Sequence, residues 1–255
     1  LSIDVASDNT TYCSIDGILF SKDRKTLICY PNGKEGAYTI PEHVTDISSA
    51  AFMLCFQLTS ITIPNSITRI SEHAFYQCIA LTSVTLPNHL THIEQWAFAD
   101  CIELQSIVIP ESVISIEKHA FGHCEKLTSV YIPAGVTFLG TEEGDANGTA
   151  FCACHSMTSI NVSSENSNYC SIDGVLFSKD RKTLYQFPCG RKDTYVIPYG
   201  TNTISSYALH ESDSLKSITI PSTVTRVEPA SMGYCKTLDS VTCYAVTPPA
   251  TGSIE

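Results

Sequence analysis

The chain has 255 residues, of which 16% are charged and 43% are hydrophobic, and its formal net charge is −11. An acidic chain argues against nucleic-acid binding, which needs clustered Lys and Arg, and against unassisted binding to anionic membranes. No apolar stretch approaches the roughly 18 residues that a membrane-spanning helix needs, so we expect no direct membrane insertion by this segment.

The first predicted element is a β-hairpin module at about residues 9–36. It reads as a short strand, a tight turn at Asp16-Gly17, a second strand, a polar turn and a returning strand. The same sequence pattern recurs 157 residues later, at about residues 166–193, where Asp173-Gly174 takes the place of the first tight turn. We expect both modules to project from a more regular body.

The regular body is a repeat of 23 residues. In each repeat a proline closes an alternating apolar segment, a phenylalanine follows eleven residues later, and a cysteine comes three residues after that. The alternating segment appears as Ile61-Thr62-Ile63-Pro64, Val84-Thr85-Leu86-Pro87, Ile107-Val108-Ile109-Pro110 and Val130-Tyr131-Ile132-Pro133. A fixed period of this length predicts a solenoid, in which each unit buries its apolar face against its neighbours.

One repeat shows which side chains should lie inside. Along the segment 81–87, Val84 and Leu86 are expected to point inward and the Ser and Thr between them outward. The apolar residues of segment 93–101 then return at spacings that suit a short helical turn. The predicted fold is therefore an α/β repeat solenoid, with short parallel strands on one face and short strands or helical turns on the other.

The repeats predict a single elongated domain over residues 1–255. We count about ten rungs, from near Ile3 to near Cys243. At about 4.8 Å per stacked strand, the solenoid should be roughly 45–50 Å long. Because the chain begins in the middle of a coil at Leu1 and shows no obvious cap, we expect it to be a fragment of a longer chain and, by itself, a monomer.

An acidic insert at residues 140–148 delays the next repeat by seven residues. Its Glu142, Glu143 and Asp145 carry oxygens that a calcium ion could use, but the spacing of an EF-hand loop is missing. We predict a solvated loop, with no metal and no cofactor.

Six of the twelve cysteines share one repeat position and should form an inward ladder: Cys55, Cys78, Cys101, Cys124, Cys154 and Cys235. The parallel Cβ directions of stacked equivalents suit disulfides poorly, so we expect free buried thiols that pack as small apolar groups. Cys170 and Cys189 flank the second module, but the matching pair in the first is Cys13 and Asn32. A disulfide common to both modules is therefore not expected.

Histidines raise the alternative of a metal site, because His119 and His123 are four residues apart and adjoin Cys124. Cys124 belongs to the predicted ladder, and no Cys-x-x-Cys pair with zinc spacing occurs, so we favour structural or solvated histidines. His73, Trp96 and His119 share a repeat position and should stack as an aromatic column. No nucleophile elbow, phosphate loop or dinucleotide fingerprint is present, so no catalytic residue is assigned and no enzyme is predicted.

A candidate protein-binding face follows from the outward strand positions. One outward column is almost entirely serine, which a solvated sheet explains without any ligand. The adjacent column varies, and Val108 and Tyr131 replace the threonine found in earlier repeats. Repeat proteins use such faces for recognition, and aromatic residues are enriched at binding hot spots. The candidate column comprises Thr62, Thr85, Val108, Tyr131, Asn161 and Thr219, with its centre at Val108, Tyr131 and Asn161 and the insert at its border.

The pattern Leu-x-x-Ile-x-Ile-Pro, followed by Ile-x-x-x-Ala-Phe-x-x-Cys, resembles the BspA-type leucine-rich repeat. The second hairpin module, with its Tyr-Cys-Ser-Ile-Asp-Gly-Val-Leu-Phe-Ser-Lys-Asp sequence, and the closing segment 244–249 also resemble that family. The resemblance covers nearly the whole chain. It implies a secreted or cell-surface protein of host-associated microbes that adheres to host proteins or other cells, and it implies no catalytic residues.

Two functions remain open from the sequence. The first is a non-enzymatic adhesion solenoid whose partners are proteins or glycoproteins of host cells and extracellular matrix, or other microbial cells. The second is a structural spacer that presents another domain and has no ligand of its own. The first predicts saturable binding by this chain alone, whereas the second predicts none.

Overall fold

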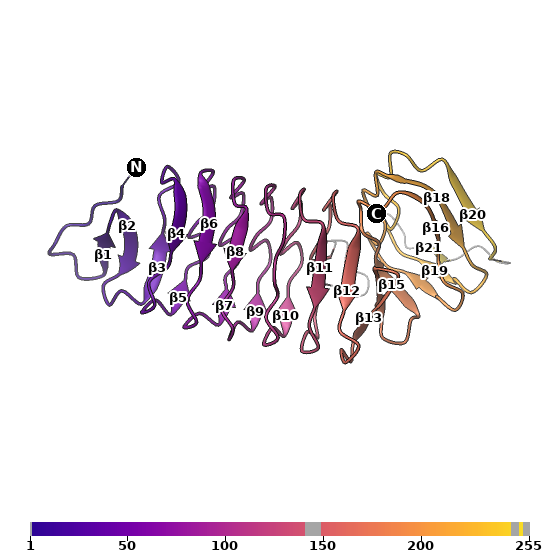
Figure 1. The fold of residues 1–255 in the computed structure, drawn as a ribbon, viewed down its shortest axis with the longest axis horizontal. Coiled ribbons are helices and arrows are strands. Elements are labelled where there is room, and N and C mark those ends of the chain that lie inside the picture. Colours follow the sequence, from indigo (N-terminus) through magenta and orange to yellow (C-terminus); the bar gives the residue numbers. More distant parts are fainter. Residues whose placement is uncertain (1, 141–148, 246–249, 252–255) are drawn as a thin grey trace.

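The computed structural model describes residues 2–140, 149–245 and 250–251. It is a solenoid of about nine rungs, stacked side by side along most of the molecule (Figure 1). We number the rungs 1 to 9 by the residue at the repeat position of Ile61, namely Tyr38, Ile61, Val84, Ile107, Val130, Ile160, Tyr195, Ile218 and Val241. The rung near Ile3 that the sequence predicts is not part of this stack.

One wall of the solenoid, which we call the strand face, is built from parallel strands. They are β4 (Gly36–Thr39), β6 (Leu58–Thr62), β8 (Ser83–Thr85), β11 (Ser129–Ile132), β12 (Ser159–Val162), β16 (Asp193–Val196), β18 (Leu215–Ile220) and β20 (Ser240–Cys243). Parallel pairing joins them into three separate groups, β4-β6-β8, β11-β12 and β16-β18-β20. Rung 4 forms no strand between the first two groups, and the second hairpin module separates the last two.

The opposite wall carries very short strands. They are β5 (Asp46–Ile47), β7 (Arg69–Ile70), β9 (His92–Ile93), β10 (Ser115–Ile116), β17 (Thr203–Ile204), β19 (Arg226–Val227) and β21 (Ala250–Thr251). Ile70, Ile93 and Ile116 stand in register on consecutive rungs and are fully buried. Each rung therefore closes its apolar interior from both walls.

The two hairpin modules have the predicted strand order. The first contains β1 (Tyr12–Ile15), β2 (Ile18–Ser21) and β3 (Thr26–Cys29), and the second contains β13 (Tyr169–Ile172), β14 (Val175–Ser178) and β15 (Thr183–Gln186). Successive strands within each module pair antiparallel. The third strand of each also pairs in parallel with the short-strand wall, β3 with β5 and β15 with β17, so the modules are anchored in the solenoid rather than simply projecting from it.

The interior is a column of stacked rings beside a column of thiols. Rings of consecutive rungs lie 4.8–5.4 Å apart from Phe52 through Phe75, Phe98 and Phe121 to Phe151, and these side chains are almost completely buried. All twelve cysteines are free thiols. The ladder thiols do more than fill space, because each donates a hydrogen bond to a carbonyl of the previous rung. For example, the Sγ of Cys101 lies 3.4 Å from the carbonyl oxygen of Phe75.

The prediction of helical turns, and with it the α/β class, is not confirmed. The described residues contain strands and tight turns but no helix. In the segments after β5, β7, β9, β10, β17 and β19 two residues adopt the left-handed conformation, as His73 (φ 56°) and Gln77 (φ 58°) do in rung 2. An α-helix does not tolerate left-handed residues at four-residue intervals, so the apolar spacing of 3–4 residues here does not indicate a helix.

Hydrogen bonds between rungs stabilise this backbone. The N–H groups of His73, Phe75 and Gln77 donate to the carbonyl groups of Gln95, Ala97 and Ala99 on the next rung. The intervening N–H groups donate to carbonyl groups three residues back in their own rung. Every rung thus needs its neighbour to pair its backbone, and this pairing offsets the cost of left-handed residues, about 1–2 kcal/mol each.

The predicted count of ten rungs was one too many, and the reason lies at Ile3. Ile3 is the sequence equivalent of Ile160, and both donate their N–H to the glycine of the module's tight turn, Gly17 and Gly174 respectively. Ile160 is assigned to a strand because β12 also pairs with β11. Ile3 is half-buried and pairs with no parallel strand among the described residues.

Candidate binding face

The candidate column predicted from the sequence lies along the strand face. Thr62 stands beside Thr85, Tyr131 beside Asn161, and Thr219 beside Thr242 in the strand pairings. The side chains of Thr62, Thr85, Val108, Tyr131 and Asn161 are exposed, whereas Thr219 is half-buried. The structure brings these residues to one wall but not into one unbroken row, because the sheet is interrupted at rung 4 and at the second module.

Val108 and Tyr131 are the large apolar members at the centre of the column. Their exposed fractions are 82% and 51%, so most of the Val108 side chain and half of the Tyr131 side chain lie in solvent. Tyr131 lies on β11, held by parallel pairing with β12, while Val108 lies on the strandless rung 4. Inward neighbours such as Val130 and Ile132 are almost completely buried, so alternation along the strand fixes the outward direction of Tyr131.

The sequence reasoning missed one member of this column. Val196 on β16 pairs with Thr219 on β18 and is 65% exposed. The repeat Tyr195-Val196-Ile197-Pro198 places it at the same position as Val108, so the signal was present in the sequence. Three exposed apolar side chains, at rungs 4, 5 and 7, therefore line one side of the strand face.

The insert expected at the border of the column falls largely on residues 141–148, outside the described part of the chain. Its two stems are described. Gly140 packs against the backbone of Lys118, and the carbonyl of Thr149 accepts a hydrogen bond from the N–H of His119. Lys118 and His119 follow β10, so both stems leave from the short-strand side rather than from the candidate column.

The aromatic column predicted at His73, Trp96 and His119 is confirmed. The Trp96 and His119 rings are parallel with centroids 4.0 Å apart, and the His73 ring lies 6.3 Å from Trp96 on the other side. The Nδ1 of His119 also lies 2.8 Å from the Sγ of Cys152. Burial raises the pKa of Cys152, which keeps the thiol protonated, the opposite of what a cysteine nucleophile requires.

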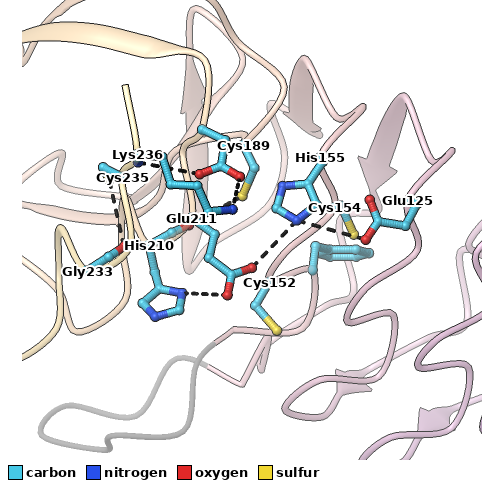
Figure 2. Close-up of polar contacts among 12 residues, drawn as sticks. Glu125, Cys152, Cys154, His155, Cys189, His210, Glu211, Gly233, Cys235 and Lys236 are labelled. Carbon is cyan, nitrogen blue, oxygen red and sulfur yellow. Dashed lines mark hydrogen bonds and ion pairs between the residues drawn. The ribbon is translucent and has the colours of Figure 1, made fainter. Parts of the chain in front are cut away.

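A second polar cluster joins the rungs on either side of the second module (Figure 2). The Nε2 of His155 lies 3.6 Å from the Oε2 of Glu211 and 3.9 Å from the Oε1 of Glu125, and the Nδ1 of His210 lies 3.8 Å from the Oε1 of Glu211. Cys152, Cys154 and Cys189 lie close by (Figure 2). Across the described residues, no group of three or more His, Cys, Asp or Glu side chains is arranged to hold a metal ion.

The interruption between β12 and β16 leaves a groove of about 530 Å³ in the strand face. The residues lining it include Ser159 and Asn161 from β12 and Arg191 and Lys192 from the segment before β16. Asp173 from the tight turn of the second module also lines it and pairs with Arg191 at 2.7 Å. Asn161, the member of the candidate column that stands beside Tyr131, thus lines this groove.

Comparison with known proteins identifies the repeat. A profile described as the BspA type leucine-rich repeat region matches six copies over residues 29–143 and 145–239. The chain belongs to the BspA-type leucine-rich repeat family. No curated protein matches it.

Several solved structures share the BspA-type fold. The pneumococcal vaccine antigen PcpA is 21% identical, with a TM-score of 0.66 over 95% of this chain and 71% of that one. A leucine-rich repeat protein from Eubacterium ventriosum is 21% identical, with a TM-score of 0.62 over 93% of this chain and 71% of that one. A leucine-rich cell surface protein from Faecalibacterium prausnitzii is 24% identical, with a TM-score of 0.51 over 87% and 73%. At these identities the likeness shows the fold alone.

BspA-type repeats are leucine-rich repeats, and solenoids of that class are usually non-enzymatic protein-interaction modules. The repeat explains the buried Phe and Cys columns, although Leu209 and Met232 replace the phenylalanine of rungs 7 and 8. It does not explain why Val108, Tyr131, Asn161 and Val196 replace the threonine that the outward column carries in the other rungs. No helix among the described residues is long and apolar enough to cross a membrane.

Proposed function

We propose that this chain is an adhesion module that binds proteins or glycoproteins of host cells, of extracellular matrix or of other microbial cells through its strand face. The observation that carries the proposal is the set of exposed apolar side chains at Val108, Tyr131 and Val196 on a rigid wall. Large side chains that stay in water cost free energy unless a partner covers them, and aromatic residues are enriched among those that dominate binding.

Rigidity of the wall supports the same proposal. Tyr131 is held on β11 between buried neighbours, β11 pairs with β12, and the tight turns of rungs 1 to 5 are each hydrogen-bonded to the next. A partner that docks here would not have to order a flexible loop, which lowers the entropic cost of binding. We also propose that the protein acts at the cell surface or after secretion, as the name of the Faecalibacterium prausnitzii relative states for that protein.

The test is saturable binding of the 255-residue chain to a panel of purified extracellular-matrix glycoproteins and to intact cells, measured by surface plasmon resonance and by flow cytometry. For a partner that binds, Tyr131→Ala should weaken the affinity about tenfold or more, which corresponds to about 1.4 kcal/mol. The matched control is Tyr234→Ala, because Tyr234 is 75% exposed but lies after the short strand β19, away from the strand face.

Two results would overturn the proposal. Equal affinities for the Tyr131→Ala and Tyr234→Ala variants would show that the strand face is not the contact surface. Absence of saturable binding to every protein and cell tested would favour the alternative, a structural spacer that presents another domain and has no ligand of its own.

A further inference from the structure

The residues around the groove between β12 and β16 can be compared with equivalent residues in the same molecule, because the first hairpin module has the same sequence pattern and the same local structure as the second. In the second module the N–H of Ile160 donates to the carbonyl of Gly174 at 2.8 Å. In the first, the N–H of Ile3 donates to the carbonyl of Gly17 at 2.9 Å. The two modules therefore sit on their preceding segments in the same way, and residues 157 positions apart can be compared directly.

A side-chain contact confirms this equivalence at the groove itself. Arg191 donates to the backbone carbonyl of Asp173 and pairs with the Asp173 carboxylate at 2.7 Å. Lys34, its equivalent, donates to the backbone carbonyl of Asp16 at 2.7 Å. A basic residue closes the module against its tight turn in both copies, so this contact is structural.

The remaining lining residues differ in charge between the copies. Asn161 and Lys192 line the groove at the second module, and their equivalents at the first module are Asp4 and Glu35. The charged lining of the second module, Asp173 with Arg191 and Lys192, has a formal charge of +1. The equivalent residues Asp4, Asp16, Lys34 and Glu35 sum to −2. The groove at the second module is thus the more positive of the two copies, in a chain whose net charge is −11.

Arg191 is held rigidly while Lys192 is free to approach a ligand. The guanidinium of Arg191 lies 5.6 Å from the Phe187 ring centroid and 5.8 Å from that of Tyr195, in addition to its pair with Asp173. Lys192 is exposed at the rim of the groove. A fixed cation beside a mobile one can attract an anionic ligand without losing the shape of the groove.

The groove does not suit an added peptide strand, although it lies at the edge of β12. The N–H of Ile160 already donates to the carbonyl of Gly174, and the carbonyl of Ile160 accepts from the hydroxyl of Ser171 at 2.7 Å. An incoming strand would therefore find this backbone position occupied. The groups that remain in the lining are hydroxyl and amide side chains, namely Thr158, Ser159 and Asn161.

We propose that this groove binds an acidic saccharide. Its volume lies within the usual range for small-ligand sites, about 300–1,000 Å³. Lys192 attracts the carboxylate of the sugar, and Asn161 and Ser159 exchange hydrogen bonds with its hydroxyl groups. The exposed ring of Tyr131, which stands beside Asn161 on the neighbouring strand β11, offers an apolar face to the sugar ring. The inference goes beyond the proposed protein binding and does not depend on it.

The experiment is a titration of the 255-residue chain with 3′-sialyllactose, digalacturonate and lactose, followed by ligand-observed NMR and calorimetry. We expect the two carboxylated sugars to bind with a dissociation constant on the order of 1 mM or tighter, and lactose at least tenfold more weakly. Lys192→Glu and Asn161→Asp, which copy the first module, should each weaken binding of the acidic sugars at least tenfold. Because both residues are surface-exposed, the variants should keep the wild-type melting temperature.

The matched control separates a local site from overall charge. Glu35→Lys in the Lys192→Glu background restores the net charge but should leave the acidic sugars unbound. Recovery of binding in that double variant, or equal binding of lactose, would overturn the proposal. Tighter binding of a hexaglutamate peptide than of either acidic sugar would overturn it in favour of an acidic peptide. No protein partner is present in this assay, so its outcome is separate from that of the Tyr131 test.

Discussion

Individual residues in this molecule have two kinds of environment, and the thiols show the difference. Burial raises the pKa of Cys101, Cys124 and Cys154, so these thiols stay protonated and donate to backbone carbonyl groups of the previous rung. Cys243, by contrast, is exposed. Buried thiols of this kind resist oxidation and alkylation because the reactive thiolate is suppressed, which makes the ladder a structural feature rather than a reactive one.

His210 makes stability depend on pH. Its side chain is 16% exposed, and burial lowers its pKa below the usual 6.5, with Glu211 opposing and His123 reinforcing the shift. The imidazole of His210 therefore binds a proton more readily in the unfolded chain than in the folded chain. Its contribution to stability is fully present above about pH 6.5, the unfolded pKa, and is lost as the pH falls through the lower pKa of the folded state. We expect His210→Gln to lose less stability than the wild type between pH 7.5 and pH 5, as measured by urea unfolding.

The control for the His210 variant is His89→Gln, because His89 is exposed. This variant should keep the pH dependence of the wild type. Parallel stability curves for the wild type and the His210→Gln variant would show that the burial of His210 has no energetic consequence.

At the scale of elements, one rung is stable only through its neighbours. The strand on one wall, the short strand on the other and the tight turns between them are each too short to persist alone. The phenylalanine column supplies the shared apolar contact, and alternating N–H groups supply the shared hydrogen bonds. A change in one rung is therefore felt by both adjacent rungs.

Phe121→Ala should lower the free energy of unfolding by about 3–5 kcal/mol, because the ring is fully buried between Phe98 and Phe151 and its removal leaves a cavity. The measurement is chemical unfolding followed by circular dichroism. Phe56→Ala is the matched control, since Phe56 is 46% exposed and should cost less than about 1 kcal/mol. Equal losses for the two variants would mean that the inward register is wrong.

At the scale of the whole molecule, the second module divides the solenoid. The apolar core is split there into two clusters, one reaching to Tyr169 and Leu176 and the other beginning at Val175 and Phe177. The rungs after the module are tilted relative to those before it (Figure 1). The polar cluster of His155, Glu125 and Glu211 then joins the two parts (Figure 2).

Asn166 is the residue that joins this module to rung 5. Its fully buried amide donates to the carbonyl groups of Pro133 and Val136 and accepts from the N–H groups of Asn168 and Tyr169. Asn166→Ala would leave these groups unpaired, so we expect a loss of about 2–4 kcal/mol in the free energy of unfolding.

The equivalent residue of the first module provides the comparison. Asn9 accepts hydrogen bonds from the N–H groups of Thr11 and Tyr12 and has no contact with an earlier rung among the described residues. Asn9→Ala should cost about 1 kcal/mol in the same urea-unfolding assay. If Asn9→Ala proved as destabilising as Asn166→Ala, the hydrogen bonds to Pro133 and Val136 would make no measurable contribution to the free energy of unfolding.

The sequence alone determined the repeat, its inward residues and the duplicated module. Proline ended each strand and period-two alternation separated Val130 and Ile132 from Tyr131, because these properties depend on local geometry that every repeat shares. The same reasoning predicted the outward column. It missed Val196, although the repeat places that residue at the same position as Val108. It also predicted helical turns, because apolar spacing cannot reveal that His73 and Gln77 are left-handed.

Tertiary structure decided what lies between the repeats. The backbone of the tight turns depends on hydrogen bonds to the next rung, so the choice between helix and turn is made by a neighbour 23 residues away. The groove with Asn161, Arg191 and Lys192 exists because the second module separates β12 from β16, which no local pattern specifies. Sequence periodicity thus fixed the repeating unit, whereas contacts between units, which depend on residues distant in the chain, fixed the surface on which function is proposed.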